Sequence, residues 1–407
     1  MQRTNSFCLL CQLCCSVLII YFCWYVVAYG NWGILVNGTF LVMCASILCI
    51  WLTEGSIDTS TIPYGIWNHL IIIFYCVVTG LFTAYDQSVL LHAVRQYTIY
   101  FVVTYACCLV SNLKGSFDWM LNTIIIATII CCIHLLFFGY HYSINRIVLT
   151  ANSNPNLVGY ILNLGLFSIL YKAKYNKTTA IIEVLLICII LYNIIMTGSR
   201  KNFIVAVSMV ASSICFVSLD RIRKGNAFLQ IFTVVCIICL FFTVRYFVNH
   251  FLINTTLYSR LQIMESDTSN EARIDMYRDA FNVFLQKPIF GGGLEQYSLW
   301  TGTGRIAHST YAEAIADFGL IGSIIYFIPY LYTVYRAFAI QNRVDEQYKC
   351  RMVLVLCMVE LFLGIVQIWF MEVTHFYCWT IIFLIVQGYS SKETTEINKR
   401  ESKYVRA

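Results

Sequence analysis

The sequence predicts an all-α, polytopic integral membrane protein. Of its 407 residues, 59% are hydrophobic and 12% are charged, and the mean hydropathy is +0.71. A soluble globular chain is about half apolar and about a quarter charged. The composition therefore excludes an ordinary cytosolic enzyme, a disordered chain and a secreted disulfide scaffold.

Apolar blocks follow one another along residues 1–407, which we interpret as a single membrane domain. Each block has roughly the 20 residues that a helix needs to cross the hydrocarbon layer. No small-residue cleavage site follows the first block, which predicts a retained span rather than a signal peptide. We predict twelve spans: Phe7–Tyr29, Ile34–Thr53, Ile66–Ala84, Tyr97–Asn112, Trp119–Gly139, Leu157–Tyr171, Thr179–Met196, Asn202–Leu219, Phe228–Val248, Tyr311–Tyr335, Met352–Met371 and Thr374–Gly388.

Prolines and cysteines fit this interpretation. Three of the four prolines fall at span edges or in connections, and Pro329, inside the tenth predicted span, predicts a kink. The 19 cysteines lie almost entirely within apolar blocks, without metal-ligand spacing in a polar loop. We therefore expect buried thiols that pack as small hydrophobic groups, and no metal site.

The distribution of basic residues predicts the orientation. With the N-terminus inside, most of the 27 Lys and Arg fall in cytoplasmic segments. Both termini are therefore predicted to be cytoplasmic, with residues 389–407 as a basic tail near anionic lipid headgroups. The net charge of +6 reflects this topological bias, so no nucleic-acid partner is expected.

The one long polar segment, residues 250–309, is predicted to be an external loop between spans nine and ten. Such a length exceeds what a connection needs, which favours a functional role. Within it, Thr268 and Glu271 have the spacing of a capping box, and residues 269–286 predict a surface helix that ends before Pro288.

Arg273 lies near the start of this predicted helix. Two interpretations are open: the side chain snorkels or pairs with Glu271 or Asp275, or it holds an anion at the headgroup level. The apolar face expected to rest on the membrane consists of Tyr277, Phe281, Phe284 and Leu285.

His308 directly precedes the tenth span. Thr310 and Glu313 have capping-box spacing, which places the imidazole at a helix N-terminus, where the dipole favours the neutral, base-competent form. The imidazole is either interfacial or catalytic. Glu313 and Asp317 could orient it, or could simply complement the dipole.

Glycines surround this region. Gly291–Gly293 could offer backbone N–H groups to an anion or form a mobile turn. Gly319 and Gly322 predict close helix packing. Between spans seven and eight, Arg200 and Lys201 start a helix on the external side, against the positive-inside bias, and combine charge with free N–H groups as a phosphate site does.

Four elements, in this order around one long external loop, resemble the O-antigen ligase and polymerase family (Wzy and WaaL types). The resemblance covers residues 150–322 and says little about the first five spans. The elements are Asn154-Pro155-Asn156, Thr197-Gly198-Ser199-Arg200, the arginine helix from Arg273 to Phe284 with Lys287–Gly293 after it, and His308-Ser309 with Gly319-Leu320-Ile321-Gly322.

The resemblance implies a GT-C-like fold and a membrane glycosyltransferase in a bacterial inner membrane. The donor would be an oligosaccharide on undecaprenyl diphosphate, the acceptor a sugar hydroxyl, and the displacement inverting, without metal or cofactor. Other polysaccharide export proteins are conceivable partners beside the bilayer. The resemblance assigns Arg200 and Arg273 to the diphosphate and His308 to the acceptor hydroxyl as base. Second-rank candidates are Arg305, Arg278, Arg146, Glu313 and Glu372.

The alternatives within the family differ in the acceptor of the glycan. We favour a polymerase that extends O-antigen, capsular or exopolysaccharide repeats over a ligase that attaches glycan to lipid A core. A flippase or transporter is the alternative of another class, and should carry charge at the midplane of its spans. Glu183 and Glu360 are the obvious candidates there, whereas the arginines gather at the external interface.

Overall fold

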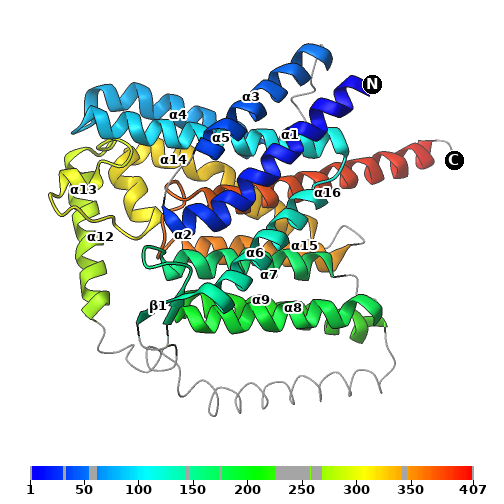
Figure 1. Ribbon diagram of the computed structural model, residues 1–407. Helices are drawn as coiled ribbons and strands as arrows, with labels where there is room; N and C mark the ends of the chain where they lie inside the picture. The colour runs from blue at the N-terminus through cyan, green and yellow to red at the C-terminus, as the bar shows by residue number, and fades with distance from the viewer. Residues whose placement is uncertain are drawn as a thin grey trace.

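The computed structural model describes residues 2–30, 34–54, 62–143, 146–173, 177–224, 257, 268–341 and 346–405. This part of the chain is mostly helical and forms a bundle of long helices (Figure 1). Figure 1 also shows both chain ends at one end of the bundle, and α12, α13 and β1 at the opposite end. The two ends of the bundle therefore differ: one carries the termini and the other carries the irregular segments.

Most elements follow the predicted apolar blocks. The helix Gln87–Lys114, however, begins ten residues before the predicted span Tyr97–Asn112, and the helix Val373–Val405 continues into the predicted basic tail, residues 389–407. A π-helix, η1 (Tyr21–Val26), interrupts the first helical segment, and a two-stranded antiparallel hairpin consists of β1 (Tyr140–Ser143) and β2 (Arg146–Val148). The α-helices are α1 (Gln2–Ile20), α2 (Val27–Tyr29), α3 (Ile34–Glu54), α4 (Tyr64–Thr83), α5 (Gln87–Lys114), α6 (Asp118–Phe138), α7 (Pro155–Lys172), α8 (Lys177–Thr197), α9 (Arg200–Lys224), α12 (Thr268–Gln286), α13 (Tyr297–Trp300), α14 (Thr310–Ile340), α15 (Gln347–Leu363) and α16 (Val373–Val405).

Seven helical segments in the described part of the chain are long and apolar enough to cross a membrane. This confirms a polytopic membrane protein. The predicted ninth span, Phe228–Val248, and the start of the predicted external loop lie outside the described residues. The seven segments are Ser6–Tyr29, Leu35–Thr53, Tyr64–Thr83, Gln87–Lys114, Asp118–Phe138, Arg200–Val217 and Thr310–Ile340.

Two connections differ from the prediction. The hairpin of β1 and β2 occupies a segment for which hydropathy predicts no regular structure. The predicted eleventh span is too long, because α15 ends at Leu363 and residues 364–372 form a non-helical loop. This loop is partly apolar in sequence. Its first N–H groups still donate to carbonyl groups of α15, whereas the carbonyl oxygens of residues 364–367 accept from neighbouring helices, as described below.

Besides the kink predicted at Pro329, α14 has a break that the sequence did not predict, ten residues earlier. Gly319 has φ 63° and ψ −165°, a conformation that favours glycine, whereas the helix continues through Pro329. A second segment meets this break. The N–H groups of Gly292 and Gly293 donate to the carbonyl oxygens of Ala316 (2.8 Å) and Asp317 (2.9 Å).

The same two segments pair in the other direction. Leu320 N–H donates to Pro288 O at 2.8 Å, and Ile321 N–H donates to Ile289 O at 3.2 Å. The orphan backbone groups around the break therefore find partners in residues 288–293. We refer to this paired backbone as the 288–293/316–321 interlock.

Glycine is required where the interlock is tightest. A Cβ on Gly291 would lie 2.3 Å from Asp317 O, and a Cβ on Gly319 would lie 2.4 Å from Gly291 N. A Cβ on Gly322 would meet the Tyr75 ring at 2.4 Å, so the close packing predicted at Gly319 and Gly322 is observed. The anion-cradle interpretation of the glycine triplet is wrong, because its N–H groups donate to backbone carbonyls.

The cysteines behave as expected for packing groups. Those in the described part of the chain are free thiols, and most of them are buried in the helical bundle. A second, smaller apolar cluster lies under α12, where Ala280 and Val283 pack with Tyr297 and Ala316. The residues of α12 that pack on the protein therefore differ from those of the predicted membrane face, on which Phe281 and Leu285 are exposed.

Replacing Gly319 by alanine should destabilise the protein by about 3 kcal/mol or more, because the substitution adds a backbone clash to the strain of a positive φ. The thermal unfolding midpoint of the purified protein in detergent measures the effect. Gly302→Ala is the matched control: Gly302 also has positive φ, but nothing lies within 4 Å of its Cβ position, so only about 1–2 kcal/mol is expected. Equal midpoints for the two variants would contradict the interlock.

Candidate active site

His308 lies immediately before α14, in a backbone conformation with φ 55° that non-glycine residues rarely adopt. Ser309 is the N-cap, since its side chain accepts from Ala312 N–H. The predicted capping box is therefore wrong, because Thr310 Oγ1 instead donates to Gln367 O at 2.6 Å. The position of His308 at a helix N-terminus holds, although the cap is one residue earlier.

Two buried carboxyl groups fix the backbone around His308. Glu313 Oε2 accepts from Ala307 N–H at 2.6 Å. Asp317 accepts from Glu295 N–H at 2.8 Å and from Tyr297 N–H at 3.1 Å. Both carboxyl groups are about 1% exposed. Glu313 and Asp317 therefore hold the segments that carry the site, and Glu313 does not face it as a substrate ligand would.

The loop of residues 364–372 joins three helices beneath His308. Thr310 N–H, at the start of α14, donates to Gly364 O at 2.7 Å. Tyr277 OH, from α12, donates to Ile365 O at 2.8 Å, and Lys201 Nζ, from α9, donates to Val366 O at 3.3 Å. The loop is thus the place where α9, α12 and α14 converge.

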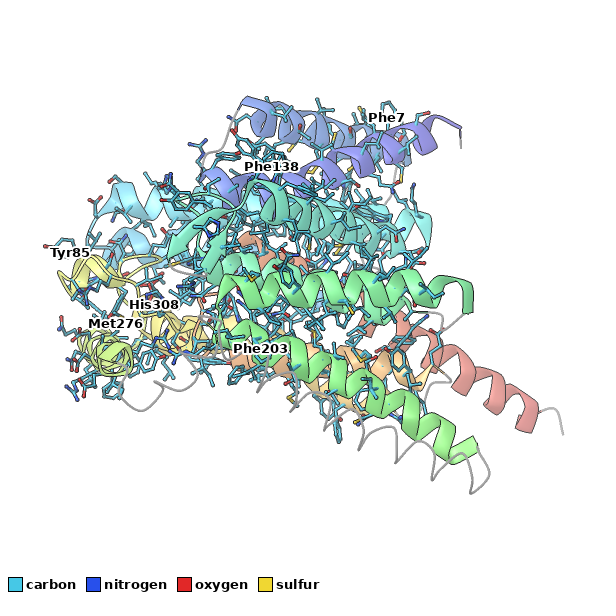
Figure 2. The ribbon with its side chains drawn as sticks, turned by 60° about the horizontal axis from the view of Figure 1, so that its bottom comes forward. Phe7, Tyr85, Phe138, Phe203, Met276 and His308 are labelled. Carbon is cyan, nitrogen blue, oxygen red and sulfur yellow. The ribbon has the colours of Figure 1, made fainter. Side chains whose placement is uncertain are left out.

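This convergence brings Lys201, Arg273 and His308 close to one another. We refer to these three residues as the cation cluster. Partial desolvation of the imidazole, which remains exposed on one side, followed by the positive charges of Arg273 and Lys201, lowers the pKa of His308 below its ordinary value. The imidazole is therefore neutral at pH 7 and can accept a proton. Figure 2 shows His308 beside α12, the helix of Arg273 and Met276.

Glu372 borders the cation cluster. Burial raises the pKa of its carboxyl to about 7, and the nearby charge of Lys201 opposes this shift. The carboxyl can consequently take up or release a proton near neutral pH. Sequence reasoning ranked Glu372 second and mentioned Lys201 only as the neighbour of Arg200, whereas the structure brings both to the same place.

Arg200 and Lys201 begin α9, and a polar network fixes this start. Ser199 Oγ donates to Asn156 Oδ1 at 2.8 Å, and Asn202 Nδ2 donates to Asn156 O at 2.7 Å. The motif Asn154-Pro155-Asn156 therefore contacts the motif Thr197-Gly198-Ser199-Arg200 directly. Their polar side chains position the start of α9.

Arg146 supports the same place from the hairpin. Its Nε donates to Thr197 O at 2.7 Å, and its aliphatic stem lies 3.4 Å from the Cβ position of Gly198. Arg146 therefore positions the turn before Arg200. The remaining second-rank arginines lie at the surface: Arg278 is 69% exposed and pairs with Asp275 at 3.2 Å, and Arg305 is exposed in the loop before His308.

Glu295 is a titratable group near the site that sequence reasoning missed. Burial raises the pKa of its carboxyl, and His92 of α5 lowers it in part. Its φ of 59° places it in the same unusual backbone region as His308. Only the tertiary proximity of Glu295 to His92 of α5 reveals it. In the described part of the chain, no three His, Cys, Asp or Glu side chains gather where they could hold a metal ion.

The known proteins can now be compared with this geometry. Residues 184–327 match the family described as O-antigen ligase. The predicted family resemblance is thereby confirmed. The O-antigen ligase match runs from α8 into α14, so it includes Arg200, Arg273 and His308.

Two further comparisons add little to the O-antigen ligase match. No curated protein matches the chain. A chain of the solved structure "Structural coordination of polymerization and crosslinking by a peptidoglycan synthase complex" aligns with a TM-score of 0.44 and 13% identity, over 80% of this chain and 97% of that chain.

The electrostatics of the cation cluster can be tested directly. Arg273→Gln should raise the pKa of His308 toward its ordinary value of 6.5, because one of the two positive charges that disfavour the imidazolium is removed. Titration of the histidine signals by NMR measures the shift, with His308→Ala to assign the resonance. Arg278→Gln is the control, since that arginine pairs with Asp275 at the surface. An unchanged pKa in Arg273→Gln would contradict the cluster.

Proposed function

We propose that the protein is a membrane glycosyltransferase that transfers an oligosaccharide from undecaprenyl diphosphate to a sugar hydroxyl at the external face of the bacterial inner membrane. The cation cluster carries this proposal. A diphosphate leaving group requires positive charge where its own negative charge grows, and an acceptor hydroxyl requires a base. Arg273, Lys201 and the neutral imidazole of His308 offer both within one site.

The proposed reaction is an inverting displacement without metal or cofactor. The acceptor oxygen attacks the anomeric carbon, the bond from that carbon to the diphosphate oxygen breaks, and the hydroxyl proton passes to His308. Arg273 and Arg200, with Lys201 beside them, stabilise the departing diphosphate. Glu372 moderates the repulsion among the cations through its electrostatic attraction to Lys201.

Membrane topology is part of the proposal. We propose twelve spans with both termini cytoplasmic, so that the cation cluster faces outward. The placement of both chain ends opposite α12 and α13 supports this arrangement (Figure 1). The helix of α12 over Thr268–Gln286, with Phe281 and Leu285 exposed, suits a surface helix in contact with the interface.

Within the family, we favour a polymerase of O-antigen, capsular or exopolysaccharide repeats. The alternative, a ligase acting on lipid A core, is supported by the description of the matching family. Deletion of the gene separates the two. Loss of a polymerase leaves single-repeat glycans, whereas loss of a ligase leaves long chains on the carrier.

A transporter fits the structure less well. Of the two acidic residues that could serve one, Glu360 is 0% exposed and bonded on both oxygens, to Tyr160 OH at 2.8 Å and to His375 Nδ1 at 2.8 Å. Such a satisfied group supports packing between α7, α15 and α16 rather than a path for a substrate.

His308→Ala should lower glycan transfer by about 10²–10⁴-fold, the range attributable to a general base. The assay uses purified protein in detergent with lipid-linked oligosaccharide, where no membrane gradient exists to drive transport. In the wild type, kcat/KM should fall on the acid side with a pKa below 6.5, because protonation of His308 removes the base.

His141→Ala is the control for this experiment, since His141 is an exposed histidine of β1 on the same end of the bundle. Its activity should equal that of the wild type. Full activity of His308→Ala would remove the base assignment, and transport without transfer would overturn the enzyme assignment.

A further inference from the structure

A cavity opens beside the β-hairpin, apart from the cation cluster. Its volume is about 480 Å³, which falls in the range of about 300–1,000 Å³ usual for ligand pockets. Phe138, at its rim, lies well away from His308 in Figure 2. The side chains that define it include Trp24, Tyr29, His134, Phe138, Tyr140 and Thr150.

The wall of this cavity depends on a rare backbone feature. Trp24 lies in η1, a π-helix, and π-helical turns often occur at functional sites. The indole Nε1 of Trp24 donates to Nδ1 of His134 at 2.9 Å, and the two rings meet edge to face with centroids 6.1 Å apart. The indole and the imidazole are thus held as a preformed wall between η1 and α6.

The opposite side of the cavity is exposed and aromatic. Phe138 is 75% exposed, Tyr140 is 50% exposed and Tyr29 is 43% exposed. Thr150 adds a hydroxyl, which donates to Ala28 O and keeps lone pairs for an acceptor role. These exposed aromatic rings have hydroxyl groups beside them. They therefore suit a ligand whose faces are apolar and whose edges carry polar groups.

The charge of the side chains that line the cavity restricts the class of ligand that the cavity can bind. Among the described residues that line the cavity there is no Lys or Arg, and no Asp or Glu. A phosphate or a lipid headgroup would lack a counter-charge there, and a cationic ligand would lack a carboxylate. A neutral pyranose satisfies the lining, because its C–H face stacks on aromatic rings while its hydroxyls bond to phenol, imidazole and threonine groups.

The hairpin connects this cavity to the cation cluster. Tyr140 of β1 lines the cavity, and Arg146 of β2, in the paired strand, donates to Thr197 O just before Arg200. A glycan chain that extends from the reaction centre along this face of the protein would therefore meet the aromatic cavity on the far side of the hairpin.

We propose that the cavity formed by η1, the end of α6 and the β-hairpin is an accessory subsite that binds neutral sugar rings of the glycan away from the reaction centre. The proposal rests on the proposed glycan substrate, but the subsite binds sugar without transfer. It holds the chain between reaction cycles and lowers the KM for long glycans, whereas the kcat of the transfer step stays unchanged.

The test is a binding measurement on the full-length protein in nanodiscs. The probe is the oligosaccharide released by mild acid from the carrier lipid of the same cells, and calorimetry gives the Kd. Phe138→Ala combined with Tyr140→Ala should weaken binding about tenfold, because two stacking faces are lost. Phe137→Ala is the matched control: Phe137 is the preceding residue of α6, is also 75% exposed and does not line the cavity.

The outcomes separate this proposal from the proposed function. If oligosaccharide binds and depends on Phe138 and Tyr140 while the wild type shows no transfer, the subsite stands and the enzyme assignment falls. If the wild type transfers glycan but binding and KM are unaffected in the Phe138 and Tyr140 variant, the subsite is overturned. A phospholipid retained by wild type and by Phe137→Ala, and lost in that variant by native mass spectrometry, would also overturn it.

Discussion

The backbone pairing between residues 288–293 and 316–321 is the constraint on which the end of the molecule opposite the chain termini depends. An unbroken α14 would leave no free carbonyls for Gly292 and Gly293 to bond. Because Gly319 departs from helical geometry, the first turns of α14 become a separate short helix. The N-terminus of that helix carries His308, and its buried Asp317 anchors the segment before α13.

The rest of the site follows from how this short helix is attached. Thr310 bonds the loop of residues 364–372, and the same loop accepts from Tyr277 of α12 and Lys201 of α9. An uncharged backbone carbonyl thus holds Lys201 near His308 and near Arg273, whose positive charge would otherwise repel it. Such an arrangement is costly unless an anion arrives, since each charge lowers the proton affinity of its neighbours.

Sequence reasoning could find what depends on local periodicity and composition. The helix over Thr268–Gln286, the helix start after Gly198 and the placement of His308 before α14 all follow from short-range patterns. The loop after Leu363 could not be predicted, because its residues are mostly apolar and the groups that donate to its carbonyl oxygens are distant in the chain. The same reason explains why the break at Gly319 was not predicted, because a distant segment pairs with the backbone on both sides of it.

The glycine triplet Gly291–Gly293 shows, at a single motif, the same limit of prediction from sequence. Three consecutive glycines allow an anion cradle, a mobile turn or a close backbone contact, and only the tertiary neighbours decide among them. Gly291 lies against Asp317 O, so its small size matters more than its N–H group. Glu313 changes role in the same way: its sequence position suits a ligand beside His308, but burial and its bond to Ala307 make it an anchor.

The central claim is that the convergence of α9, α12 and α14 forms a site for a diphosphate. The most direct measurement is the Kd of the purified protein for geranyl diphosphate, compared between wild type, Arg273→Gln and Arg278→Gln. Loss of one charge-assisted contact in Arg273→Gln should weaken binding by about 10- to 100-fold, while Arg278→Gln should bind as the wild type does. Equal affinity of wild type and Arg273→Gln would contradict the account.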